Sequence, residues 1–367
     1  MISGPTVIYF YLKGDAAINK TFVFLITFVL LLTLPAISQA AEKAADIQKT
    51  TWQDFLSDIF GHYPLPTIAP TDESAGKITK LDIPKNWEFN VETKRYVASH
   101  TSYEFGTEDI RPLSRLQFPV NTWWMNFDVR RTCPRWSIGG RAGFSVNRNS
   151  NNWMLDSDWE SPGTDHVLTD YAKLYCDVRN AFLFRGDVDI NISDWLGLPP
   201  ELEIRPLFAF QFQRYSLMAH DGEADNVPVL GDIISFRQDW YTYMIGLRGS
   251  YNIKMSKNMI VKIKGEADWG PALGYFEDHH IQRGDFTVYQ NTMGNALYFL
   301  TGLDMTVSKT ITMGIGIDYL WIRAYGTERE WNPAPTDKTS PFDASFTDDV
   351  KSWTDQLGLT VHVSYAF

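Results

Sequence analysis

Two-residue periodicity recurs along this chain and limits the possible folds more than any other feature of the sequence. From Trp87 to the carboxyl terminus, apolar side chains alternate with small or polar ones in several separate runs. The alternating apolar positions include Trp136, Ile138, Ala142, Phe144 and Val146; Val261, Ile263, Ala267 and Trp269; Ile311, Met313, Ile315, Ile317, Tyr319 and Trp321; and Leu357, Leu359, Val361, Val363, Tyr365 and Phe367. A helix cannot use this pattern, whereas a strand with an apolar environment on one side can. The chain is therefore predicted to be all-β.

The composition identifies that apolar environment as lipid. Aromatic residues make up 14% of the 367 residues, yet the mean hydropathy is −0.23, which is too polar for a bundle of membrane helices. Aromatic richness without long apolar runs is typical of a transmembrane β-barrel, in which lipid-facing residues alternate with polar ones and aromatic girdles mark both interfaces.

The alternating runs predict about ten strands, an even number like that of closed bacterial barrels. They lie near 87–104, 116–131, 135–147, 168–193, 202–219, 233–252, 259–269, 286–307, 310–326 and 351–367. Between them, short turns alternate with long polar segments near 148–167, 220–232, 270–285 and 327–350. Short turns belong on the periplasmic side and long loops outside the cell. Residues 87–367 are therefore predicted to form a transmembrane antiparallel barrel of the bacterial outer membrane with long extracellular loops.

The residues before the barrel indicate export. The apolar run at 21–34 follows Lys13 and Lys20 and precedes small residues up to Ala40. This arrangement predicts a secretory signal peptide at 1–40, with an uncleaved anchor as the alternative. Residues 41–86 are expected to be an N-terminal extension or linker without chemistry of its own.

Two short segments with titratable side chains lie in or beside the predicted outer loops. Residues two apart in an extended chain project to the same side, so Asp156 pairs with Asp158 and Asp278 with His280. Facing one another, the pairs would form a site in which Asp278 orients His280 and a water lies between His280 and a carboxylate. The two neighbouring aspartates would tend to hold one proton between them. Such a site hydrolyses bonds without a covalent intermediate; the alternative is ordinary loop acids and surface histidines.

The predicted outer loops are acidic as a group. Their acidic residues are Asp156, Asp158, Glu160, Asp165, Asp221, Glu223, Asp225, Glu277, Asp278, Asp285, Glu328 and Glu330. A concave rim of one sign concentrates ligands of the opposite sign, so we expect cationic peptides or proteins as substrates. The alternatives are that these acids keep the barrel soluble or bind divalent cations among lipopolysaccharide phosphates.

These segments resemble those of a known family, the omptins, which are outer-membrane aspartyl endopeptidases built on a ten-stranded barrel. Residues 154–159, followed by 161–165, resemble the family's Asp-x-Asp-Trp segment and its Pro-Gly-Thr continuation. Residues 277–280 resemble its Asp-x-His segment. Further similar stretches lie at 180–195, 213–216, 245–251 and 364–367, so the resemblance covers most of the predicted barrel.

The resemblance implies catalytic roles for the same four residues. Asp156 and Asp158 would be the carboxylate couple, Asp278 and His280 the dyad, and a water would be activated between Asp156 and His280. The implied reaction is hydrolysis of a peptide bond at the cell surface.

The resemblance also implies binding residues. Asp165 and Glu104 would bind substrate, and Arg214 would contact a lipopolysaccharide phosphate. Arg214 is separated by an even number of residues from predicted lipid-facing residues of its strand, so it should project from the same face. Its height near the outer rim suits a phosphate partner. The alternative is a snorkelling side chain at the membrane interface. The chain departs from the family at Phe276, where many members carry an acid, and at Asp239, which replaces a second lipopolysaccharide-contacting arginine. These departures put a preference for basic residues and a dependence on lipopolysaccharide in doubt.

The sequence therefore predicts an omptin-type aspartic endopeptidase whose active site faces the extracellular side. Its expected partners are peptide or protein substrates, outer-membrane lipid and lipopolysaccharide, without nucleic acid. No metal or other cofactor is expected. The alternatives are a non-catalytic barrel that serves as an adhesin, binding protein or pore, and a lipid-modifying enzyme, for which His362 on the lumen side is a poor candidate.

Overall fold

The computed structural model describes residues 87–106, 112–159, 167–256, 259–283, 286–332 and 342–367. The predicted signal peptide and N-terminal extension lie outside the described residues. The chain divides into two compact units, and all the strands belong to the larger one, Pro70–Ser193 with Pro200–Phe367. No helix in the described part of the chain is long and apolar enough to cross a membrane.

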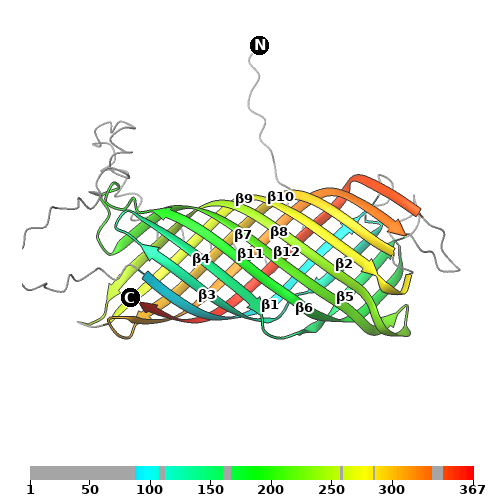
Figure 1. Ribbon diagram of the computed structural model, residues 1–367, viewed down its shortest axis with the longest axis horizontal. Coiled ribbons are helices and arrows are strands. Elements are labelled where there is room, and N and C mark those ends of the chain that lie inside the picture. Colours follow the sequence, from blue (N-terminus) through cyan, green and yellow to red (C-terminus); the bar gives the residue numbers. More distant parts are fainter. Residues whose placement is uncertain (1–86, 107–111, 160–166, 257–258, 284–285, 333–341) are drawn as a thin grey trace, which may run out of the picture. The chain divides into compact units, whose positions relative to one another are not determined.

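Twelve strands of the described residues form one antiparallel sheet that closes on itself (Figure 1). They are β1 (Trp87–Phe105), β2 (Ser114–Pro119), β3 (Trp123–Thr132), β4 (Trp136–Ser145), β5 (Asn149–Trp159), β6 (Leu168–Ile190), β7 (Leu202–Ala224), β8 (Val227–Lys254), β9 (Ile260–His280), β10 (Phe286–Thr306), β11 (Ile311–Asn332) and β12 (Phe342–Ala366). A short 3-10 helix, η1 (Ile281–Arg283), follows β9. Pairing of β12 with β1 closes the ring.

The ring has ten positions. The short strands β2 and β3 both pair with β1, at different heights, and β4 and β5 both pair with β6. Two positions thus hold two short strands in tandem, and each of the other eight holds one long strand. The predicted antiparallel barrel of about ten strands is confirmed.

The predicted long loops are largely strand, which corrects the expected loop boundaries. β5 occupies most of the first loop, β9 continues through His280, and β11 and β12 extend into the last. β7 and β8 meet in a two-residue turn in which Asp225 and Asn226 both have positive φ, 50° and 64°, as a type I′ hairpin requires. The predicted site segments therefore lie on strands.

The sequence pattern changes toward the end of the barrel that carries the predicted site, because the surroundings of the wall change there. On the outer face of β9, Trp269 and Tyr275 are 53% and 49% exposed. The next outward residue along the strand, Glu277, forms an ion pair of 2.6 Å with Arg237 of β8. A strand beyond the lipid no longer needs apolar outward residues, so the alternation that marks a lipid-facing strand disappears there.

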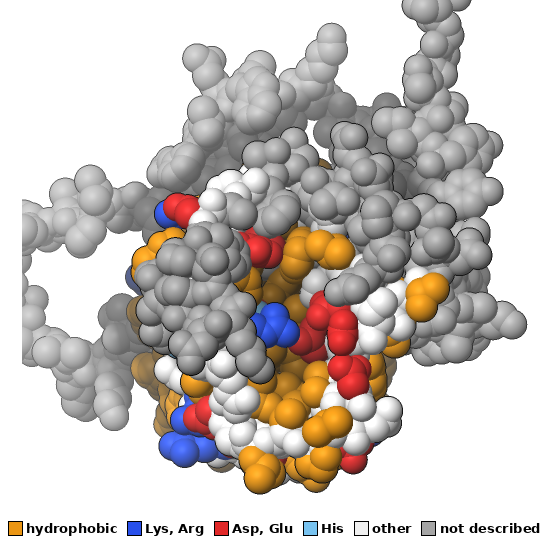
Figure 2. Space-filling view, turned by 90° about the vertical axis from the view of Figure 1, so that its right-hand side faces the viewer, with side chains coloured by type: hydrophobic (Ala, Val, Ile, Leu, Met, Phe, Trp, Pro, Cys, Tyr) orange, Lys and Arg blue, Asp and Glu red, His pale blue; other side chains and the backbone are white. Residues whose placement is uncertain are grey.

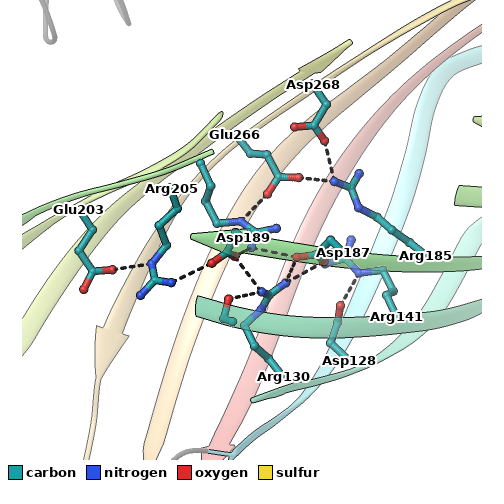
Figure 3. A network of polar contacts seen from close by, with 12 residues as sticks. Asp128, Arg130, Arg141, Arg185, Asp187, Asp189, Glu203, Arg205, Glu266 and Asp268 are labelled. Carbon is teal, nitrogen blue, oxygen red and sulfur yellow. Dashed lines mark hydrogen bonds and ion pairs between the residues drawn. The ribbon is translucent and has the colours of Figure 1, made fainter. Parts of the chain in front are cut away.

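A network of ion pairs lies in the lumen (Figure 3). At the same height, the outward neighbours Val188 and Leu247 are 43% and 48% exposed. The carboxylate of Asp189 lies 3.1, 2.8 and 2.6 Å from the guanidinium groups of Arg130, Arg205 and Arg248. Between this network and the predicted site lie buried aromatic side chains, including Tyr96, Trp124, Tyr215, Trp240 and Phe276. The lumen is thus packed with side chains below the predicted site.

Candidate active site

β9 carries both members of the predicted Asp278–His280 dyad on its inner face. Asp278 and His280 are 1% and 7% exposed, while Glu277 projects to the outer face. Nε2 of His280 lies 3.3 Å from Oδ2 of Asp278. The ring of His280 also packs at 4.9 Å against Phe286, its cross-strand neighbour on β10. The structure therefore brings the dyad together as the two-residue spacing predicts.

Tyr103 of β1 gives Asp278 a second hydrogen-bond donor. Its hydroxyl donates to Oδ2, the same oxygen that faces His280. Its ring is 1% exposed and stacks at 5.7 Å on Phe236. Burial and the charge of Asp278 raise the pKa of Tyr103 well above its ordinary value, so the hydroxyl keeps its proton. No local sequence pattern indicates this contact, because it joins residues 175 positions apart.

β5 carries the predicted carboxylate couple on its inner face. Asp156 and Asp158 share parity with Met154, which is fully buried. Asp156 lies opposite Leu116 of β2, and Leu116 lies opposite Tyr103 of β1. One cross-strand row therefore runs from Asp156 along the wall to Tyr103, whose hydroxyl reaches across to the dyad.

The electrostatics connect the couple with the dyad. Burial is the main cause that raises the pKa of Asp156 to about 7; the charge of Asp158 acts in the same direction, while His280 and Arg283 act against it. Oδ1 of Asp156 is buried without a hydrogen-bond partner among the described residues. Near neutral pH, Asp156 is therefore divided between its protonated and ionised forms.

Two glutamates of β11 face the same site, although the sequence placed them only in an acidic rim. Glu328 lies opposite Gln290 of β10. Glu330 is the next residue of β11 on the same face as Glu328, and Val288 of β10 lies between Glu330 and Asp278 in one cross-strand row. Nε2 of Gln290 donates to Oε2 of Glu328 at 2.6 Å. Burial, with the charges of Glu330 and Asp278, raises the pKa of Glu328 to about 8. Figure 2 shows acidic side chains gathered around the hollow at this end of the barrel.

Glu104 lies apart from the dyad. It is on the opposite face of β1 from Tyr103, and Arg115 and Lys351 hold its carboxylate at 2.6 and 3.0 Å. A step of one residue reverses the face of a strand, so the loose match that selected Glu104 does not bring it into the site. The other predicted substrate-binding residue, Asp165, lies outside the described residues.

Arg214 projects from the outer face of β7, as its parity predicts. Its guanidinium hydrogen-bonds both carboxylate oxygens of Asp239 on β8, at 2.6 and 2.5 Å. It also lies over the rings of Phe182 and Phe212, at 5.5 and 5.7 Å. Arg214 thus has a carboxylate partner within the protein at the position where the resemblance implies a phosphate.

Comparison with known proteins agrees with this architecture. The model of the Omptin family matches residues 103–338. The outer membrane protease OmpT from Escherichia coli is similar in structure, with a TM-score of 0.65 at 15% identity over 78% of this chain and 98% of that chain. The translocator domain of the autotransporter NalP from Neisseria meningitidis is a weaker match, with a TM-score of 0.32 at 10% identity over 77% and 88%.

The outer membrane protein OprG from Pseudomonas aeruginosa is also a weaker match, with a TM-score of 0.33 at 10% identity over 77% and 95%. No curated protein sequence matches this chain. The family model covers more than half of the chain and includes Asp156, Asp158, Asp278 and His280. The chain therefore belongs to the omptin family.

Proposed function

We propose that this protein is an outer-membrane endopeptidase with Asp156, Asp158, Asp278 and His280 as its catalytic residues. Membership of the omptin family supports a protease of the outer membrane. The observation that carries the assignment of residues is that both predicted pairs face one site from different strands. His280 lies 3.3 Å from Asp278, and its charge acts on the pKa of Asp156.

The dyad acts as the base in this mechanism. Oδ2 of Asp278 accepts a hydrogen bond from the N–H at Nε2 of His280, which leaves Nδ1 with a lone pair. A water held between Nδ1 and Asp156 gives a proton to the imidazole as its oxygen attacks the peptide carbonyl carbon. The negative charge of Asp278 stabilises the imidazolium that forms.

The carboxylate couple supplies both orientation and a proton. An ionised oxygen of the couple accepts a hydrogen bond from the attacking water and so fixes its direction. The proton that the couple holds passes to the amine that leaves when the carbon–nitrogen bond breaks. A pKa of about 7 suits Asp156 to this task, because a group that exchanges protons near its own pKa is the most effective acid or base.

We further propose that the site faces the outside of the cell and accepts cationic substrates. The site lies beyond the apolar outer band, at the end where the wall carries charged pairs such as Arg237–Glu277. At the opposite end, short turns join β3 to β4, β8 to β9 and β10 to β11, as is typical of the periplasmic side. Acidic side chains around the opening would concentrate cationic peptides there.

The test is cleavage of a peptide library by the refolded full-length protein, with and without lipopolysaccharide, beside Asp156→Ala and His280→Ala. We expect each substitution to lower kcat by about a thousandfold or more, as is usual for residues of a catalytic unit. His279→Ala is the matched control, since it removes an imidazole from the opposite face of the same strand. Folding is verified by heat-modifiable electrophoretic mobility. A folded wild-type barrel that cleaves nothing would instead favour an adhesin or binding protein.

A further inference from the structure

A cavity of about 510 Å³ opens on the outer face of the wall, where β2 gives way to β3. β2 and β5 lie side by side at the end of the barrel that carries the proposed site (Figure 1). Trp153 and Leu155 of β5 line the cavity and alternate with the inward Met154 and Asp156. The cavity therefore opens away from the lumen, and its size is that of a site for a small molecule.

The cavity lies beyond the apolar outer band. On β6, the outward side chains Val188 and Phe184 are apolar and exposed, as in a lipid-facing strand. Toward the proposed site, Arg179 follows on this strand and forms an ion pair of 3.2 Å with Asp232, in which both side chains are about half exposed. Lys173, which lines the cavity, lies further still in the same direction. The cavity therefore faces the polar layer outside the lipid.

An irregularity in β1 builds the floor of the cavity. The register of β1 with β12 shifts between Val97 and His100, and Ala98 within this shift has a φ of 47°. The backbone N–H of Ser99 donates at 2.8 Å to Oδ1 of Asn121, in the connection between β2 and β3. Such bulges re-aim side chains and are frequent beside functional sites. Because Oδ1 of Asn121 is engaged, its amide nitrogen is the group that this side chain can offer to a ligand.

The lining carries a positive charge and several hydrogen-bond donors, and none of its residues within the described ranges is an acid. Nζ of Lys173 lies 4.7 Å from the centre of the Trp153 ring. Tyr175 packs against the same ring at 4.1 Å and so fixes its position. Glu223 is the cross-strand neighbour of Lys173 on β7, but the two form no ion pair in the described part of the chain. Lys173 is therefore available to an anion.

The acid beside His100 is already paired. His100 lines the cavity, and its Nε2 lies 3.5 Å from Asp355 of β12. Arg323 of β11 binds both oxygens of this carboxylate, at 3.2 and 2.9 Å, and the hydroxyl of Tyr319 donates to it at 2.7 Å. In a chain with a formal net charge of −11, an anion in this cavity thus meets a cation and no acid in the lining.

We propose that this cavity binds an acidic sugar, with its carboxylate on Lys173 and its hydroxyl groups on the amides of Gln117 and Asn121. One ammonium group complements a single carboxylate charge, whereas an arginine fork is the better match to a phosphate. Amide side chains donate and accept hydrogen bonds, as hydroxyl groups do. The apolar surfaces of Trp153 and Leu155 can cover the C–H face of the ring. Binding here uses neither the lumen nor the catalytic residues and so goes beyond the proposed protease function.

Binding of a simple sugar acid tests the site. The probe is methyl glucuronide, compared with methyl glucoside, which has a hydroxymethyl group in place of the carboxylate. Saturation-transfer NMR of the refolded full-length protein in a sugar-free detergent should give a Kd on the order of 1 mM for the acid and about 10-fold weaker binding of the neutral sugar. Lys173→Gln should remove this difference. Lys351→Gln, which alters a lysine paired with Glu104 outside the cavity, should leave both affinities unchanged.

Gln117→Trp gives a second variant, in which a larger side chain on the outer face of β2 fills the cavity. Both sugars should lose binding to it, in a protein whose heat-modifiable mobility shows a folded barrel. A lipid that carries the same sugar, glucuronosyl diacylglycerol, then identifies the source of the ligand by competition in mixed micelles. Stronger competition than by the soluble glycoside would support a membrane glycolipid as the ligand, and equal competition would support a soluble glycan.

Four results would overturn the proposal. They are no binding of methyl glucuronide, equal binding of the acidic and neutral sugars, acid binding that survives both Lys173→Gln and Gln117→Trp, and displacement of the acid by an equal concentration of inorganic phosphate. The last result would show a general anion site. None of these measurements involves peptide cleavage, so their failure and the failure of the protease proposal are distinguishable.

Discussion

The hydroxyl of Tyr103 donates a hydrogen bond to Oδ2 of Asp278, the oxygen that also lies 3.3 Å from Nε2 of His280. The carboxylate is therefore held between a donor on β1 and a donor on its own strand. β1 is also the strand that closes the ring by pairing with β12. The orientation of the imidazole consequently depends on the closure of the barrel as well as on the local course of β9.

Replacement of Tyr103 by Phe should lower kcat with little change in KM. The ring and its stacking on Phe236 remain, but Asp278 loses one of the two donors that fix it. The loss of a hydrogen bond to a charged group corresponds to about 10- to 100-fold in rate. Steady-state kinetics of the folded variant measure the effect, with Tyr275→Phe on the exposed outer face as control. An unchanged kcat would show that His280 and the strand alone orient the carboxylate.

Replacement of Asp158 by Asn should shift the alkaline limb of the profile of kcat/KM against pH to lower pH, so that the profile becomes narrower. Burial and the charge of Asp158 both raise the pKa of Asp156, so removal of that charge lowers the pKa from about 7. In the proposed mechanism, turnover needs the protonated form of Asp156, so activity is lost as pH rises through this pKa. The loss should therefore begin at lower pH in the variant. Activity should also fall at acidic pH because a protonated imidazole accepts no proton. kcat/KM measured from about pH 5 to pH 9 spans both limbs; an alkaline limb that does not move would contradict the role of the couple.

The barrel could be predicted from sequence, and so could the placement of each candidate pair on one face of a strand, because both depend on the two-residue period of a strand. That period places Asp156 and Asp158 on one face of a strand, and Asp278 and His280 likewise. The result does not depend on the residue at which the strand ends. The outer strand boundaries could not be predicted in the same way. There, outward positions such as Glu277 and Arg237 form ion pairs, and no lipid imposes apolar alternation on them.

The positions of Tyr103 and Glu328 beside Asp278 could not be predicted because they depend on register and on contacts across the lumen. A shift of one residue on β1 would exchange Tyr103 with Glu104, which faces outward and pairs with Arg115 and Lys351. The position of Glu328 relative to Asp278 is set by two successive strand registers, that of β9 with β10 and that of β10 with β11. Neither register is visible in the local sequence pattern.

Replacement of Asp239 by Asn should strengthen the response to lipopolysaccharide. In the wild type, Asp239 holds Arg214 with two short hydrogen bonds and competes with any phosphate. Without that carboxylate, the lipopolysaccharide concentration that gives a half-maximal effect on cleavage should fall by about tenfold. The double variant Arg214→Ala and Asp239→Asn should lose this gain. An equal response in all three proteins would place the lipopolysaccharide contact elsewhere.

Replacement of Asp189 by Asn should destabilise the barrel much more than replacement of Asp343. The side chain of Asp189 is fully buried and pairs with three arginines. Arg130 and Arg248 keep other close carboxylates. The buried Arg205 keeps only Glu203, at 3.4 Å, so the loss costs about 3 kcal/mol. Asp343 pairs with Arg329 at 2.7 Å, but both side chains are more than half exposed, and such pairs contribute about 0–1 kcal/mol. Denaturant unfolding in detergent compares the two. Similar midpoints would show that the lumen tolerates the loss of the carboxylate closest to Arg205.

Replacement of Glu328 by Gln should stabilise the barrel at alkaline pH. The folded-state pKa of Glu328 is about 8, against an ordinary value of 4.5. Between these two values the folded state holds a proton that the unfolded state has lost, so its stability falls as pH rises through that window. Gln carries no charge and avoids this cost, which is on the order of a few kcal/mol above the folded-state pKa. The unfolding midpoint of Glu328→Gln should therefore exceed that of wild type at about pH 9 and match it at about pH 4.

The matched control for this effect is Glu277→Gln, which removes a carboxylate from the exposed outer face of β9 and should give the same small change at both pH values. A midpoint that rises equally at both pH values in Glu328→Gln would mean that packing, rather than the cost of a buried charge, decides the result. A rise confined to alkaline pH would show that the barrel sacrifices stability to keep an ionisable carboxyl group beside the dyad. Such a sacrifice is expected where a charge serves binding, because replacing a functional buried charge commonly gains stability at the expense of activity.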